Sequence, residues 1–150
     1  MHTFITQAYA SGCNIVILSS SFERAQIIPG VCHDNIQISC LDCSADTGKI
    51  AAAYDDQVII FEPTPLISLS KNSNSNDGGG CSKESKNLNY WWVETARIKA
   101  ECNVSTLAWN NDATRFFTAG EFLQLWQHEI KQGKLYKKNF VKSIFEKKIR

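Results

Sequence analysis

Ile50-Ala51-Ala52-Ala53-Tyr54, the pair Asp55-Asp56, and Gln57-Val58-Ile59-Ile60-Phe61 decide the fold of this chain. Two mainly apolar runs of five residues are separated by two acidic residues that favour a tight turn, which is the pattern of two antiparallel strands. Because the runs are apolar at nearly every position rather than at alternate ones, they predict strands that are covered on both faces. A further strand at residues 35–43 and a polar turn at residues 44–48 precede them, so the unit has three strands.

The same succession of strands and turns occurs twice more along the chain. One copy covers residues 103–126, and the other, at residues 8–18, is truncated to its last two strands. The apolar residues that close the third strand of each copy are Leu18, Phe61 and Trp126, which lie 43 and 65 residues apart. A repeat of about 40 to 45 residues is typical of the four-stranded blade of a WD-type propeller. The repeat therefore predicts an all-β, partial WD-repeat β-propeller of about two and a half blades.

An inserted segment accounts for the longer of the two spacings. Residues 71–80 form a polar, low-complexity run that cannot bury enough apolar area to order itself. We predict an insertion loop at residues 64–89 within an incomplete propeller segment that covers residues 1–128. Closed propellers have at least four blades, so we expect the chain to be a fragment, a truncated isoform or a partial gene model. It would need the rest of the propeller, or self-association, to cover its open faces.

WD blades usually contain a hydrogen-bonded network of His, Asp, Ser or Thr, and Trp, and the repeats here keep part of it. The middle copy has a His before its first strand and an Asp in its turn, but Phe61 stands at the position of the Trp. The last copy keeps Trp126, with a Thr eight residues before it. We assign structural roles in the blades to His33, Asp55, Phe61, Trp109, Thr118 and Trp126.

The residues after 128 differ from the blades in charge. Residues 131–150 contain eight basic residues and one acidic residue, whereas residues 1–130 carry a net charge of −6. Phe140, Val141, Ile144 and Phe145 would share one face of a helix for about two turns, so we describe residues 129–150 as a basic tail for which a helix is one candidate conformation. Three roles stay open: binding to anionic lipid, docking on an exposed blade face, or a loosely ordered segment. The residues that would contact lipid or a partner are Lys137, Lys138, Phe140, Lys142, Phe145 and Lys147.

The sequence offers little that could perform chemistry. Cys40 and Cys43 form the only close cysteine pair, whereas a structural zinc site needs four convergent ligands, and residues three apart in a strand point to opposite faces. We expect buried thiols, no cofactor and no metal, with a small zinc-binding protein as a remote alternative. Neither a phosphate-binding loop nor a nucleophile elbow occurs, so we predict no catalytic residues and no enzyme.

Charge and hydropathy limit the classes of partner and the compartment. A net charge of +1 provides no field that would steer the chain onto nucleic acid, so we expect no nucleic-acid partner. The longest apolar runs, such as Ile15-Val16-Ile17-Leu18, are four residues long, and the first residues do not form a signal peptide. We expect a cytoplasmic protein with reduced cysteines.

Several short segments together resemble one known family. Ala8-Tyr9-Ala10-Ser11-Gly12-Cys13-Asn14-Ile15-Val16-Ile17-Leu18, followed by Phe22-Glu23 and Gln26-Ile27-Ile28-Pro29-Gly30, resembles the amino-terminal propeller of the DmX-like proteins, the rabconnectin alpha subunits. Asn35-Ile36-Gln37, Leu107-Ala108-Trp109 and Leu125-Trp126 continue the resemblance in the same order. It covers roughly residues 8–127 outside the predicted insertion.

The resemblance implies a function that the composition and spacing do not show. DmX-like proteins are very long cytosolic scaffolds associated with the assembly and regulation of the vacuolar-type proton ATPase, with vesicle acidification and with vesicle membranes. It implies a non-enzymatic interaction module whose partners are proton-ATPase subunits or other rabconnectin subunits, in the cytoplasm or peripherally on endomembranes or synaptic vesicles. The alternative that the residues themselves suggest is a peripheral membrane or polyanion-binding protein that acts through the basic tail.

Overall fold

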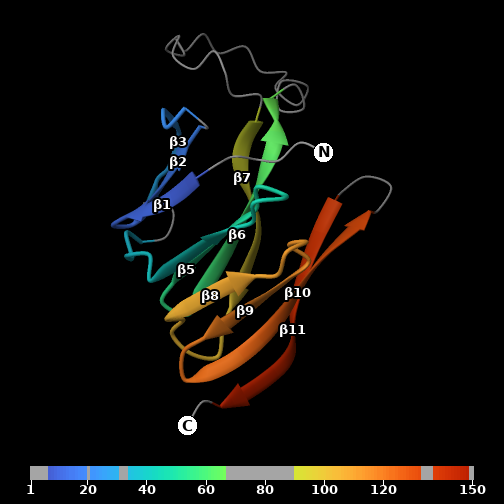
Figure 1. Cartoon of the computed structure of the whole chain (residues 1–150). Helices are drawn as coiled ribbons and strands as arrows, with labels where there is room; N and C mark the ends of the chain where they lie inside the picture. The colour runs from blue at the N-terminus through green and yellow to red at the C-terminus, as the bar shows by residue number, and fades with distance from the viewer. Residues whose placement is uncertain (1–6, 20, 31–33, 67–89, 133–136, 149–150) are drawn as a thin grey trace.

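A computed structural model describes residues 7–19, 21–30, 34–66, 90–132 and 137–148 of the chain. The described residues are nearly all in strands or in the turns between them (Figure 1). In chain order the strands are β1 (Gln7–Ser11), β2 (Asn14–Leu18), β3 (Arg24–Ile28), β4 (Cys40–Cys43), β5 (Ile50–Tyr54), β6 (Gln57–Pro65), β7 (Tyr90–Lys99), β8 (Thr106–Trp109), β9 (Arg115–Ala119), β10 (Phe122–Gln132) and β11 (Lys137–Lys148).

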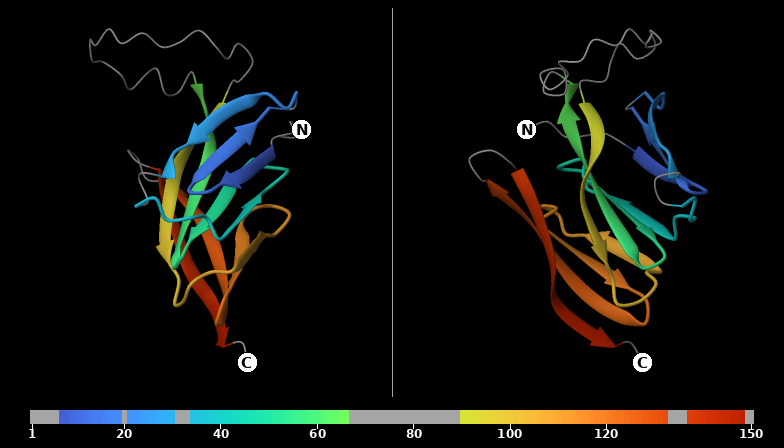
Figure 2. Two further views of the ribbon diagram at one scale, coloured as in Figure 1. Left: turned by 90° about the vertical axis from the view of Figure 1, so that its left-hand side faces the viewer. Right: turned by 180° about the vertical axis from the view of Figure 1, so that it is seen from behind.

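The strands form three antiparallel sheets, each made only of strands that follow one another in sequence. Their orders are β1-β2-β3, β4-β5-β6-β7 and β8-β9-β10-β11, which we call blades 1, 2 and 3. The blades lie side by side as a fan with blade 2 in the middle, as the views from three directions agree (Figures 1 and 2). This arrangement confirms the predicted all-β partial propeller, with one three-stranded and two four-stranded blades.

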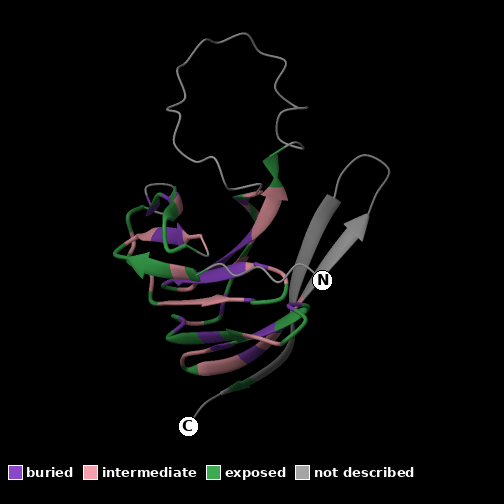
Figure 3. Ribbon diagram, turned by 45° about the horizontal axis from the view of Figure 1, so that its top comes forward, coloured by how far each residue is buried: buried purple, intermediate pink, exposed green. Residues whose placement is uncertain are grey.

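The inner strands of blade 2, β5 and the first half of β6, are buried on both faces, as their apolar runs predict. All five residues of β5 are buried, and they divide alternately between two cores (Figure 3). Ile50, Ala52 and Tyr54 pack in the first core, which blade 1 completes with residues such as Ile15 and Ile17. The second core lies between blades 2 and 3 and contains Ala51, Ala53, Val58, Ile60, Phe116 and Trp126. The three alanines keep β5 thin enough for a neighbouring sheet to approach each face closely.

The tail is a strand, rather than the helix that was one candidate conformation or a loosely ordered segment. Residues 137–148 form β11, which pairs antiparallel with β10 along its whole length and becomes the outer strand of blade 3. The apolar stripe of a helix would last only about two turns, which is too short to stabilise an isolated helix. The edge of β10 instead offers a row of backbone hydrogen-bonding groups, and the β-branched and aromatic residues of the segment suit a strand.

Other element boundaries also differ from the predicted ones. Strand β3 lies at residues that we did not assign to a strand, and it completes blade 1. Strand β6 extends to Pro65, so residues 64–65 belong to a strand, while residues 67–89 of the predicted insertion lie outside the described part. Strand β10 continues past residue 128 to Gln132. Among the described residues, no helix is long and apolar enough to cross a membrane.

One buried side chain ties the outer strands of blades 1 and 2 together. Gln26 on β3 donates from Nε2 to the carbonyl oxygen of Trp92 at 2.9 Å and accepts the backbone N–H of Trp92 at 2.8 Å. Trp92 lies on β7, the last strand of blade 2, so among the described strands none pairs with its outward backbone groups. The Gln26 amide thus supplies both hydrogen bonds that a neighbouring strand would make.

Replacing Gln26 with Leu should destabilise the protein, because the substitution keeps the volume but leaves a buried N–H and C=O of Trp92 without partners. We expect the free energy of unfolding to fall by about 1–3 kcal/mol, measured by urea denaturation. Gln37→Leu is the matched control at an exposed position, and it should change stability by less than about 0.5 kcal/mol. Equal stability of the two variants would show that the Gln26 clamp contributes nothing.

Candidate functional site: a polar hollow between blades 2 and 3

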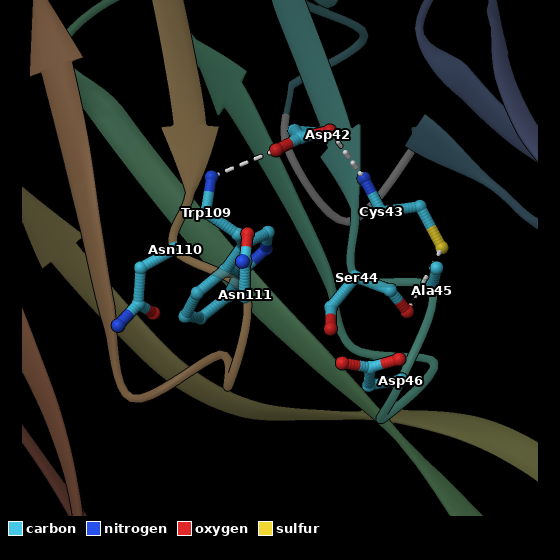
Figure 4. Close-up of a pocket in the computed structure, with 8 residues that line it drawn as sticks. All are labelled: Asp42, Cys43, Ser44, Ala45, Asp46, Trp109, Asn110 and Asn111. Atoms are coloured by element: carbon cyan, nitrogen blue, oxygen red, sulfur yellow. Dashed lines mark hydrogen bonds between the residues drawn. The ribbon is translucent and has the colours of Figure 1, made fainter. Parts of the chain in front are cut away.

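A hollow of about 330 Å³ opens between blades 2 and 3 at the end where β4 and β8 finish (Figure 4). Two turns form its walls, the one from β4 to β5 and the one from β8 to β9. We call it the polar hollow because five of its eight lining residues carry a hydroxyl, amide or carboxylate group. Its lining residues are Asp42, Cys43, Ser44, Ala45, Asp46, Trp109, Asn110 and Asn111.

Asp42 joins the two walls of the polar hollow. Its carboxylate accepts the backbone N–H of Trp109 in blade 3 at 2.7 Å and the backbone N–H of Cys43 in blade 2 at 2.9 Å (Figure 4). Hydrogen bonds to an ionised acceptor are about twice as strong as neutral ones, so this single side chain fixes the spacing of the two turns. Sequence analysis missed Asp42, although an acid inside the otherwise apolar strand Cys40-Leu41-Asp42-Cys43 was a usable signal.

Two further polar side chains tie blade 2 to blade 3. Ser39 donates from Oγ to the carbonyl oxygen of Val104 at 2.6 Å. Lys49 donates from Nζ to the carbonyl oxygen of Ala113 at 3.4 Å and also forms a salt bridge with Glu62 at 3.5 Å. The Lys49 contact joins the same two turns as Asp42, at the walls of the polar hollow, whereas Ser39 joins the two blades at the other end of β4.

Three of the predicted blade residues lie together behind the polar hollow. Trp109 packs against Phe116, with 4.9 Å between ring centroids, and Phe116 stacks on Trp126 at 6.4 Å. The indole Nε1 of Trp126 donates to Oγ1 of Thr118 at 2.9 Å. Trp109 therefore connects the wall of the hollow to the second core.

The remaining predicted residues lie elsewhere. Phe61 is buried in the first core, and Asp55 occupies the turn between β5 and β6 with a φ of 53°, where its carbonyl oxygen accepts the N–H of Val104 at 2.7 Å. His33 lies outside the described residues. The predicted contact residues of the tail all lie on β11, and only the side chain of Lys147, which is exposed, is among those described; the others are Lys137, Lys138, Phe140, Lys142 and Phe145.

The two close cysteines do not converge. Cys40 packs against the second core and Cys43 against the first, so they lie on opposite faces of β4. Burial, and to a smaller extent the neighbouring Asp42 carboxylate, raises the pKa of the Cys43 thiol to about 11, and burial also raises the pKa of Cys40. Both thiols are therefore protonated at neutral pH. Within the described part of the chain, no three His, Cys, Asp or Glu side chains gather to hold a metal ion.

The groups at the opening of the polar hollow can bind the polar groups of a partner. Asp46 and Asn111 are exposed at the opening of the polar hollow, one on each wall. Carboxylate and amide oxygens on rigid turns can accept hydrogen bonds from the basic or polar side chains of another protein. The hollow thus offers a preformed, negatively charged recess at the junction of two blades.

Asp42→Asn should weaken the junction, because an amide has one acceptor oxygen and would point its NH₂ group at the second backbone N–H. We expect the free energy of unfolding to fall by about 1–3 kcal/mol, measured by chemical denaturation. Asp46→Asn, on the same hollow but exposed, is the matched control and should change stability by less than about 0.5 kcal/mol. Identical effects of the two changes would contradict the bridging role of Asp42.

The raised pKa of Cys43 predicts slow alkylation, because only the thiolate reacts. At pH 9 a thiol with a pKa of about 11 is only about 1% ionised, so iodoacetamide should label Cys43 far more slowly in the folded protein than in the denatured protein. The folded rate should rise between pH 9 and 11, as measured by mass spectrometry of the Cys43 peptide. A folded rate equal to the denatured rate would show that the thiol is not protected by the blade.

Comparison with known proteins is consistent with the repeat and the fold. No family model matches the chain. The chain is 42% identical to human DmX-like protein 1 over 123 residues and 40% identical to the mouse protein of the same name over 127 residues, which are 81% and 83% of this chain. It spans only 4% of the length of these relatives.

A solved β-propeller has the same fold. The crystal structure of Kluyvelomyces marxianus Hsv2 superposes with a TM-score of 0.60 and 12% sequence identity, and the match covers 97% of this chain and 46% of that one. At this identity the structural match establishes the fold alone. The sequence similarity over four fifths of its length shows that this chain, a partial WD-repeat propeller, belongs to the DmX-like protein family.

Proposed function

We propose that the chain is a non-enzymatic protein-interaction module of a DmX-like scaffold, and that it contributes to assembling and regulating the vacuolar-type proton ATPase by contacting its subunits. The family similarity supports a WD-repeat scaffold. The proton ATPase as partner is what the sequence resemblance implies, and the other rabconnectin subunits are the second class of partner. Such a module would act on the cytoplasmic side of endomembranes.

The observation that carries the proposal is the polar hollow. Its two walls are turns of neighbouring blades that Asp42 holds together, so a partner would meet a surface that needs no ordering before binding. The exposed Asp46 at its opening gives the recess negative charge. A partner segment that carries Lys or Arg fits this charge, and it would associate faster at low salt.

The structure favours this proposal over binding through a basic amphipathic helix. Residues 137–148 are hydrogen-bonded to β10 as a strand, so the helix that would lie on a lipid surface is not formed. A polyanion-binding role for the basic residues of β11 would appear as capture that depends on this strand rather than on the polar hollow.

The test is affinity capture from vesicle extract with the full chain, with bound proteins identified by mass spectrometry. We expect the unaltered chain to capture proton-ATPase subunits and Asp46→Lys to capture several-fold less, because it reverses the charge at the opening of the hollow. Glu121→Lys is the matched control: it makes the same change in an exposed turn at the other end of blade 3, and it should capture as the unaltered chain does.

Two results would contradict the proposal. Recovery of chaperones without proton-ATPase or rabconnectin subunits would remove the proposed partners. Equal capture by Asp46→Lys and the unaltered chain would show that the partners bind elsewhere than at the polar hollow.

A further inference from the structure

The polar hollow carries negative charge that no basic side chain on its walls offsets. Asp42 and Asp46 contribute two carboxylates, and among the described residues that line the hollow none is Lys, Arg or His. Lys49, at the end of the turn from β4 to β5, is directed to the Glu62 carboxylate and the carbonyl oxygen of Ala113. The walls of the hollow therefore favour a cationic ligand.

The two carboxylates lie on opposite sides of the polar hollow (Figure 4). Asp42 lies where β4 and β8 face each other, and each of its carboxylate oxygens accepts one backbone N–H, from Cys43 and from Trp109. An ionised carboxylate offers about four lone-pair sites, so Asp42 can still accept hydrogen bonds from a ligand. Asp46 lies at the exposed opening, on the turn that follows β4. A ligand that bonds to both sides must present donors in more than one direction.

Trp109 adds an aromatic surface to the same hollow. Its side chain is half-buried, and its indole packs against Phe116 with 4.9 Å between the ring centroids. This packing holds the ring in place, so a ligand would meet an aromatic surface that is already ordered. Among aromatic side chains, an indole attracts a stacked cation most strongly.

Among the cationic side chains of proteins, arginine matches these walls best. A guanidinium is planar, carries several N–H donors in a fixed fork, stacks on aromatic rings and has no acceptor. The ammonium of lysine is a compact and strongly hydrated charge, which gains less from an aromatic surface. The hollow offers acceptors on its two walls, the carboxylates and the amide oxygen of Asn111. Its volume of about 330 Å³ is at the lower end of the range for ligand pockets, which suits one side chain.

We propose that the polar hollow binds a single arginine side chain of the partner protein, with the guanidinium stacked on the Trp109 indole and hydrogen-bonded to Asp46, while Asp42 supplies the second negative charge. This inference deepens the proposed function and rests on it for the ligand being part of a protein. The backbone of an arginine inside a polypeptide is neutral, whereas free arginine carries a carboxylate that the two aspartates repel. The hollow therefore favours an arginine within a chain over the free amino acid.

NMR titration of the isotope-labelled full chain tests this assignment. The probes are N-acetyl-arginine N-methylamide, the corresponding lysine derivative and free arginine. We expect the capped arginine to shift the backbone N–H signals of Asp46 and Asn111, and the capped lysine and free arginine to bind about fivefold more weakly. The side-chain proton signals of the bound arginine should move upfield, because protons above an indole ring are shielded.

Asp46→Asn tests the charge at the opening without changing its shape. The variant should bind the capped arginine about fivefold more weakly, because the hydrogen bond to Asp46 is no longer made to an ionised acceptor. Glu121→Gln is the matched control: it removes one charge from an exposed turn at the other end of blade 3, and it should bind the capped arginine as the unaltered chain does.

Three outcomes would overturn the arginine assignment. Equal binding of the capped lysine would show that the hollow responds to charge alone. Free arginine that binds as tightly as the capped form would make the amino acid itself the ligand. Unchanged signals of Asp46 and Asn111 with every probe would show that the hollow holds no cationic side chain.

Affinity capture separates a failure of this inference from a failure of the proposed function. If Asp46→Lys loses the proton-ATPase subunits while no arginine probe binds, the interaction module remains and the arginine assignment is wrong. If the capped arginine binds as expected but the chain captures neither proton-ATPase nor rabconnectin subunits, the arginine site remains and the proposed partners are wrong.

Discussion

The whole structure depends on one strand that has no solvent-facing side. Every residue of β5 is buried, and alternate side chains belong to different cores. A strand in this position cannot shift its register by one residue, because the shift would exchange Ile50 and Tyr54 with the alanines between them. The sizes of these side chains set how closely blades 1 and 3 approach blade 2, and hence where the loops of all three blades lie.

Polar contacts then fix the alignment of neighbouring blades, which apolar packing alone leaves undetermined. Packing brings two sheets together but is non-directional, whereas Gln26, Ser39 and Asp42 bond to particular backbone groups of the neighbouring blade. Each of these side chains binds a backbone group that lies at a blade edge or turn. They therefore fix how neighbouring blades align. One of them, Asp42, lies between the two turns that form the walls of the polar hollow.

The sequence predicts the inner strands well and the outer ones poorly, for a physical reason. Strands such as β5 and β6 are apolar on both faces, which leaves an unmistakable pattern, and their spacing reveals the repeat. The outer strand β3 carries both polar and apolar residues, and β11 has a spacing of apolar residues that also fits a helix. In both cases the segment becomes a strand because it pairs with the edge of a neighbouring strand, and this pairing cannot be read from the sequence of the segment itself. The polar hollow could not be predicted either, because Asp42 and Trp109 are 67 residues apart and meet only when two blades pack.

The confinement of each sheet to consecutive strands has a consequence for how the chain folds. Among the described strands, none of one blade pairs with a strand of another, so every backbone ladder joins consecutive strands; apart from the β6–β7 ladder, which spans residues 66–89, each closes a short loop at a small cost in loop-closure entropy. During synthesis, blade 1 can form its hairpins before blade 2 has left the ribosome, and each later blade then meets a finished surface. Assembly would proceed as a growing stack, with the last-made edge exposed at every stage until the next blade arrives.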